Sequence, residues 1–199
     1  MRNPRFCRHS RRRTRARAYI PAVMRRNPSR RQFLLAAAAA AVAQRAAAAQ
    51  ALRTDWPRHK PTPALTLRQL DGSAWTLAAQ RGHPVLLNFW ATWCEPCREE
   101  MPALAQLAER EQASGLRVVA VNYREAEAAV RRFVETTSLA LSVALDADGT
   151  VAKLFDAHAF PTTVAIDAGG SVRFAVMGEC DWTAAPGRAW LDELLGRRS

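Results

Sequence analysis

The chain has 199 residues and a formal charge of +11 at pH 7. The charge is uneven, because residues 1–49 hold 13 of the 29 Lys and Arg and none of the 18 acidic residues, which leaves 16 basic against 18 acidic residues elsewhere. A domain with that balance has no general attraction for a phosphate backbone, so we expect no nucleic-acid partner. The length allows one domain of ordinary size behind a leader.

Residues 1–49 have the anatomy of an export signal. The stretch SRRQFLL at residues 29–35 precedes an alanine-rich apolar run, and small residues surround Ala49. This order is typical of a twin-arginine signal peptide, and a start at Met24 gives that signal an ordinary length. The run is shorter than the roughly 20 residues of a membrane span, and Arg45 interrupts its continuation. We therefore expect a periplasmic protein, soluble or loosely tethered to the membrane.

The cysteine count points to redox chemistry rather than to structural disulfides. Cys7 lies in the leader, so an exported protein keeps Cys94, Cys97 and Cys180. A close pair plus one odd thiol indicates a redox pair and a bystander, and we interpret Cys180 as a plain buried thiol.

After the leader we expect a proline-spaced linker at residues 50–62 and one domain at residues 63–199. Alternating residues at 65–70 and 74–77, separated by Asp71-Gly72, predict a β-hairpin. The apolar run at 84–90 predicts a strand buried on both faces. Periodicity and turn residues further predict helices at 95–112, 126–136, 151–155 and 183–195, and strands at 116–121, 143–145, 162–166 and 172–176. This order predicts an α/β fold with a mixed central sheet, an N-terminal hairpin and helices on both faces.

The pair Cys94-Glu95-Pro96-Cys97 lies where a buried strand passes into a helix. A Cys-x-x-Cys spacing alone serves zinc binding as well as disulfide exchange, so its context decides. At a helix N-terminus the unpaired amides favour a thiolate at Cys94, and Cys97, one turn further on, can resolve a mixed disulfide. The carboxylate of Glu95 opposes thiolate formation at Cys94, which favours a reductant over an oxidant.

The segment NFWATWCEPCREEMP at residues 88–102 resembles the active-site segment of TlpA-like and ResA-like exported thioredoxins, with weaker similarity at residues 121–123, 160–163 and 166–167. The resemblance implies a thioredoxin fold and thiol:disulfide oxidoreductase activity without a cofactor or metal. It also implies a cis Phe160–Pro161 bond facing the cysteine pair, where Pro161 shapes a substrate groove. The residues expected to contact substrate are Trp93, Glu95, Pro96 and Phe160.

One position departs from general thioredoxins, which place a buried aspartate six residues before the first cysteine. This chain has Asn88 there, and an amide side chain does not titrate. In ResA-like proteins a glutamate after the Val-Asn strand approaches the cysteines, and Glu125 has a similar position. We therefore expect Glu125 to accept a proton during exchange; the alternative is a solvated glutamate in the first turn of a helix.

The resemblance suggests that the substrates are exported protein thiols and disulfides, such as apocytochrome c before haem attachment, with electrons supplied by a membrane thiol donor. We expect a monomer. Two alternatives stay open at this point: a copper or zinc carrier that uses Cys94, Cys97 and His158, and a peroxiredoxin-type peroxidase on the same fold.

Overall fold

The structure is a computed structural model that describes residues 51–197. The expected signal peptide, the start at Met24 and Cys7 lie outside these residues. Among residues 51–197, no helix combines the length and the apolar content needed to cross a membrane.

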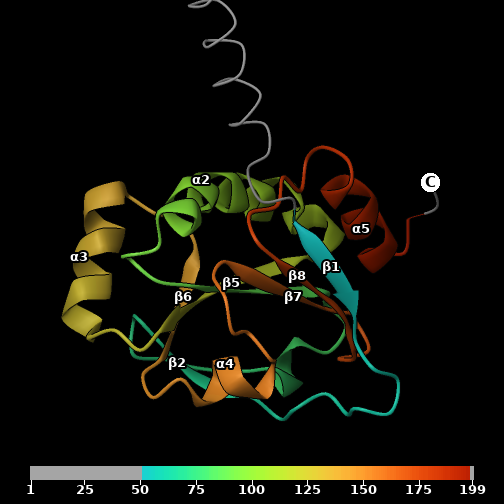
Figure 1. The fold of residues 1–199 in the computed structure, drawn as a ribbon, viewed down its shortest axis with the longest axis horizontal. Helices are drawn as coiled ribbons and strands as arrows, with labels where there is room; N and C mark the ends of the chain where they lie inside the picture. Colours follow the sequence, from blue (N-terminus) through green and yellow to red (C-terminus); the bar gives the residue numbers. More distant parts are fainter. Residues whose placement is uncertain (1–50, 198–199) are drawn as a thin grey trace, which may run out of the picture. The chain divides into compact units, whose positions relative to one another are not determined.

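A single mixed sheet of eight strands organises the domain (Figure 1). Its strands lie in the order β1-β8-β7-β4-β5-β6-β2-β3. The pairs β4–β5 and β5–β6 are parallel and the others antiparallel. The strands are β1 (Leu52–Asp55), β2 (Thr66–Gln69), β3 (Ala74–Thr76), β4 (Val85–Trp90), β5 (Arg117–Tyr123), β6 (Ser142–Asp146), β7 (Thr162–Ile166) and β8 (Val172–Met177).

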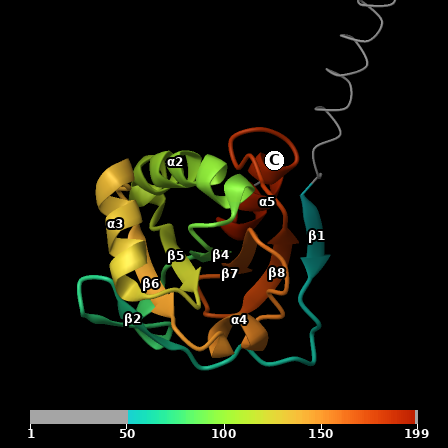
Figure 2. The ribbon, with the colours of Figure 1, turned by 60° about the vertical axis from the view of Figure 1, so that its left-hand side comes forward.

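Helices cover both faces of the sheet (Figures 1 and 2). One face carries α2 (Glu95–Arg110), α3 (Glu127–Thr137) and α5 (Gly187–Leu194), whose apolar side chains pack in two clusters. The other face carries the short helix α4 (Thr150–Leu154), beside a third cluster. The predicted α/β fold with a mixed sheet and an N-terminal hairpin is confirmed.

Strand β4 lies at the centre of the sheet, between parallel β5 and antiparallel β7. All six of its residues are buried, which explains why the segment is almost wholly apolar. The chain leaves β4 at Trp90 and enters α2 at Glu95, so the cysteine pair lies at the carboxyl end of the most buried strand.

Two segments differ from the sequence-based expectation. Leu52–Asp55, inside the expected linker, forms β1 and pairs with β8 along its whole length. Helix α5 begins at Gly187 rather than near Thr183, because the Asp181 carboxylate accepts hydrogen bonds from the amide and hydroxyl of Thr183. Such a local side-chain turn competes with helix formation.

Asp146, at the end of β6, fixes the start of α4 from inside the fold. Its side chain is buried, and it accepts hydrogen bonds from the amides of Val151 at 3.1 Å and Ala152 at 2.8 Å. A carboxylate in this position satisfies amides that the first turn of a helix leaves unpaired.

We predict that Asp146→Ala lowers the free energy of unfolding by about 2–3 kcal/mol, because it leaves buried amides without an acceptor. Urea denaturation of the oxidised protein measures this loss. Asp148→Ala is the matched control, since the Asp148 carboxylate is exposed and accepts from the amide of Thr150 at the surface, and it should cost far less. Equal losses in the two variants would contradict the assignment.

Candidate active site

Cys94 and Cys97 form a disulfide across the first turn of α2, with Cα atoms 5.3 Å apart. Cys94 is the N-cap residue, and its Sγ accepts a hydrogen bond from the Cys97 amide at 3.3 Å. Cys94 is 6% exposed and Cys97 is 0% exposed. An amide aimed at Sγ stabilises a thiolate, so the more accessible sulfur is also the one that its surroundings favour as nucleophile.

The two residues between the cysteines differ in their surroundings. Pro96 lies in the first turn of α2, where the absence of an amide hydrogen costs no helical hydrogen bond. The Glu95 carboxylate is exposed and pairs with Arg98 at 3.0 Å. Solvent and Arg98 therefore weaken the influence of the Glu95 charge on Cys94.

The Phe160–Pro161 bond is cis, as the resemblance implies, and it immediately precedes β7. Phe160 packs against the apolar cluster that contains Cys94 and Cys97, which places this loop beside the disulfide. Trp93 is 67% exposed and meets Phe160 edge-on, with ring centroids 6.2 Å apart. Trp90, by contrast, is fully buried, so Trp93 is the tryptophan available to a partner, as expected.

Glu125 binds the loop that carries the cysteines rather than lying free in solvent. Its carboxylate accepts hydrogen bonds at 2.7 Å from the amide of Thr92 and from Nδ2 of Asn122, and a third from the Thr92 hydroxyl. Glu125 therefore joins the end of β5 to the residue two positions before Cys94. This contact holds the loop in place, and none of the three hydrogen bonds involves a cysteine sulfur.

Asn88, which replaces the aspartate of general thioredoxins, is completely buried in β4. Its Nδ2 donates to the Thr163 hydroxyl at 3.0 Å, whereas Oδ1 has no hydrogen-bond partner. The side chain links β4 to β7 but cannot exchange a proton.

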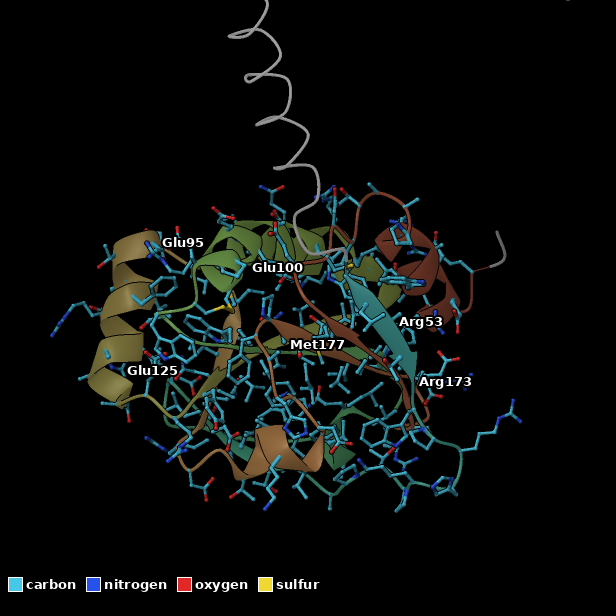
Figure 3. All side chains as sticks on the ribbon, viewed as in Figure 1. Arg53, Glu95, Glu100, Glu125, Arg173 and Met177 are labelled. Carbon is cyan, nitrogen blue, oxygen red and sulfur yellow. A yellow bond between two sulfur atoms is a disulfide. The ribbon has the colours of Figure 1, made fainter. Side chains whose placement is uncertain are left out.

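The buried acid of this site is Glu100, which the sequence analysis missed (Figure 3). Glu100 follows Cys97 by three residues, so the two share the inner face of α2, and it is only 2% exposed. Neither carboxyl oxygen makes a hydrogen bond of ordinary geometry, although the Trp182 side chain and the Cys180 backbone lie close enough to oppose part of the rise in its pKa. Burial, assisted by the charge of Glu179, raises the pKa of Glu100 to about 8. Glu100 is therefore a neutral acid at pH 7, one helical turn from the resolving sulfur.

A periodicity signal for Glu100 was present in the sequence. The buried residues of α2 are Cys97, Glu100, Met101, Leu104 and Leu107, and their helical spacing puts Glu100 among the apolar positions.

Cys180 lies close to Glu100, in the loop after β8. It is the free cysteine of the described residues and it is buried. Burial and the nearby Glu100 carboxyl raise the pKa of the Cys180 thiol to about 12. The thiol is thus unreactive at neutral pH, in keeping with the bystander interpretation.

The structure does not bring His158 to the cysteine pair. The side chain is exposed, with Nε2 3.9 Å from Asp156 Oδ1. Within residues 51–197, no three His, Cys, Asp or Glu side chains come together in a metal-binding arrangement.

We predict that Glu100 makes the stability of the oxidised protein fall as pH rises. Its pKa is about 8 in the folded protein, against an ordinary glutamate pKa of 4.5, so between these values the folded protein holds one proton more than the unfolded chain. Unfolding free energy should then decrease by about 1.4 kcal/mol per pH unit from this group. Urea denaturation at several pH values between 5 and 8 should show the slope in the native protein and its loss in Glu100→Gln. Parallel curves for the two proteins would exclude a buried neutral Glu100.

Comparisons with known proteins agree on the family. Residues 59–175 match the AhpC/TSA family. A thioredoxin-like protein YneN of Bacillus subtilis is 41% identical over 114 residues, which cover 56% of this chain and 66% of the relative. The thiol-disulfide oxidoreductase ResA of Bacillus subtilis is 36% identical over 116 residues, which cover 58% of this chain and 65% of the relative. The matched regions thus span about two thirds of these relatives.

Solved structures of disulfide-exchange proteins have a fold similar to that of this chain. A putative thiol:disulfide interchange protein DsbE from Chlorobium tepidum aligns with a TM-score of 0.64 and 28% identity, covering 69% of this chain and 96% of that one. A secreted disulfide oxidoreductase of Mycobacterium tuberculosis aligns with a TM-score of 0.53 and 27% identity, covering 66% and 94%. The chain therefore belongs to the AhpC/TSA family, as a thioredoxin-fold member of the thiol-disulfide oxidoreductase type.

Proposed function

We propose that this protein is exported and reduces disulfides in other exported proteins, with apocytochrome c before haem attachment as a candidate substrate. The observation that carries the proposal is the difference in exposure between the two cysteines at the start of α2. Cys94 is the more exposed of the two, and Cys97 is completely buried. The twin-arginine pattern of residues 29–35 supports export. We propose further that the protein is a monomer, and that the domain expected at residues 63–199 is extended by β1.

The reaction proceeds in two exchanges. The Cys94 thiolate attacks one sulfur of the substrate disulfide, forms a mixed disulfide and releases the other substrate sulfur as a thiolate, which takes up a proton. Cys97 then loses its proton and attacks Cys94, which releases the second substrate thiol and closes the Cys94–Cys97 disulfide. The substrate gains two electrons and the enzyme loses two. A membrane thiol donor reverses the change and restores the dithiol.

Glu125 is the proposed proton acceptor for this cycle. The second exchange needs the Cys97 thiolate, and Asn88 offers no acceptor. Glu100 is neutral at pH 7 because of its raised pKa, so it is a poor acceptor and a better proton reserve. Glu125 is held to Thr92 by two hydrogen bonds, close to the cysteine loop.

The charge of Glu95 near Cys94 favours the reductant direction of transfer. Glu95 disfavours the Cys94 thiolate, so the dithiol is stabilised less than in a site without that charge. A less stabilised dithiol gives up electrons more readily, which favours the reductant role. The exposed ion pair of Glu95 with Arg98 makes this contribution small.

We predict that Cys97→Ser, in a Cys180→Ser background, accumulates mixed disulfides with exported proteins, because the resolving thiol is absent. Non-reducing electrophoresis of periplasmic extracts, followed by mass spectrometry of the bands, identifies the partners. Cys94→Ser in the same background is the control, since it lacks the proposed nucleophile. The proposal fails if both variants trap the same partners equally, or if neither traps any.

A second prediction concerns Glu125→Gln. If Glu125 accepts a proton, the exchange rate at pH 7 should fall on the order of 100-fold, the lower end of the effect of a positioned base, and its dependence on pH should change. Stopped-flow measurement of disulfide reduction between pH 5 and 9 gives the profile. Glu127→Gln is the matched control, because Glu127 pairs with Arg68 and Arg131 on the outside of α3. An unchanged profile for Glu125→Gln would refute the assignment.

A further inference from the structure

The described residues expose four large apolar side chains, and three of them lie around the redox end of the sheet. Trp93 is 67% exposed, Leu52 61% and Met177 41%, and the fourth, Leu154, lies apart on α4. A scattered apolar residue on a surface needs no explanation, but a continuous set often marks a site of interaction.

We group three of these residues with Phe160 as an apolar strip, which we define as Trp93, Phe160, Met177 and Leu52. Trp93 meets Phe160 edge-on, and Phe160 is bonded to Pro161 at the start of β7. Across the strands, Thr162 pairs with Met177, and Met177 pairs with Leu52. The amide of Gly178 also donates to the Pro161 carbonyl at 2.8 Å, which ties the end of β8 to the loop beside the disulfide.

The strand register puts Leu52 and Met177 on the same face as Thr162, since directly paired residues project to the same side of a sheet. Leu52 lies two strands away from Thr162, or about 10 Å at ordinary strand spacing. An extended segment of about three residues spans the distance from Thr162 to Leu52. Thr162 directly follows the cis Phe160–Pro161 bond, and Phe160 packs against the cluster that contains the cysteine pair.

Strand β1 holds Leu52 in a fixed position. Arg53 points to the opposite face, where it pairs with Glu193 of α5 at 2.5 Å and lies 4.0 Å from the centre of the Phe174 ring (Figure 3). These contacts, with the pairing to β8, anchor the edge strand and leave Leu52 directed at solvent. An ordered apolar side chain loses less conformational entropy on binding than a mobile one.

We propose that Leu52 and Met177 extend the partner-binding face of the cysteine pair and bind an apolar side chain that flanks the reactive cysteine of a protein substrate. This inference rests on the proposed function and adds a preference within it. The strip begins at Trp93, which directly precedes Cys94 in the chain. Its small size suits a transient redox encounter, whereas a stable pairing of two copies of this chain needs roughly 1,000 Å² of interface, more than a four-residue edge strand offers.

Two synthetic peptides test the proposal. Each carries one cysteine as a mixed disulfide with thionitrobenzoate; one has leucine at the second to fourth positions on both sides of the cysteine, and the other has serine there. Attack by Cys94 on the peptide sulfur releases thionitrobenzoate, which is followed by absorbance, and the second-order rate constants of the two peptides are compared for the reduced protein.

For the native protein we expect the leucine peptide to react about tenfold faster than the serine peptide, the effect of burying about one apolar side chain. In Leu52→Ser/Met177→Ser the ratio should fall to about one to two, and in Leu52→Ser alone to an intermediate value. Leu154→Ser removes from α4 an apolar residue that is as exposed as Met177, and it should keep the native ratio. A general folding defect lowers both rates together and leaves the ratio intact.

A native ratio near one, or a native ratio retained in Leu52→Ser/Met177→Ser, overturns the proposal. Sedimentation of the native protein provides a further test: a dimer that dissociates when Leu52 and Met177 are replaced shows that a second copy occupies the strip, and it also overturns the proposal. A native protein that reacts with neither peptide contradicts the proposed function itself, which is a distinguishable result.

Discussion

The structure depends on one junction, the short connection between the fully buried strand β4 and the first turn of α2. Because β4 is held on both sides by neighbouring strands, the position of Cys94 is set by the interior of the sheet and not by a surface loop. The first turn of α2 contains Cys97, and the amide of Cys97 donates a hydrogen bond to Sγ of Cys94, which stabilises a thiolate there. Glu125 and the Phe160–Pro161 loop close the site from β5 and β7.

The site has two acidic residues in different surroundings: Glu100 is buried in its interior, and Glu125 lies at its edge. Asn88 links two strands without titrating, and the buried acid is instead on the helix, at Glu100. Burial keeps Glu100 neutral and Cys180 protonated at pH 7, so the interior beside α2 gains no charge from either group. Glu125, by contrast, accepts three hydrogen bonds at the margin of the site, an arrangement that suits a carboxylate.

Much of this arrangement could be predicted from the sequence, because its signals are local. The hairpin, the buried strand β4 and the amphipathic helix α2 each follow from residue spacing, and the cysteine motif indicates the junction between the last two. Strand β1 could not be predicted, since LRTD has no strong alternation and its stability comes from pairing with β8, far away in the chain. The helical spacing places Glu100 on the buried face, but its proximity to Cys180 depends on how the loop after β8 folds back. The positions of Leu52 and Met177 beside the redox loop likewise follow only from strand order.

The central claim is that Cys94 is the accessible nucleophile of a reversible disulfide and that Cys97 is protected behind it. Limited alkylation of the reduced protein with iodoacetamide at pH 7, followed by peptide mass spectrometry, tests this claim directly. The account predicts that the label accumulates first on Cys94, that Cys97 and Cys180 lag far behind, and that reoxidation of unlabelled protein restores a Cys94–Cys97 disulfide. Preferential labelling of Cys97, or reoxidation that pairs either cysteine with Cys180, would contradict it.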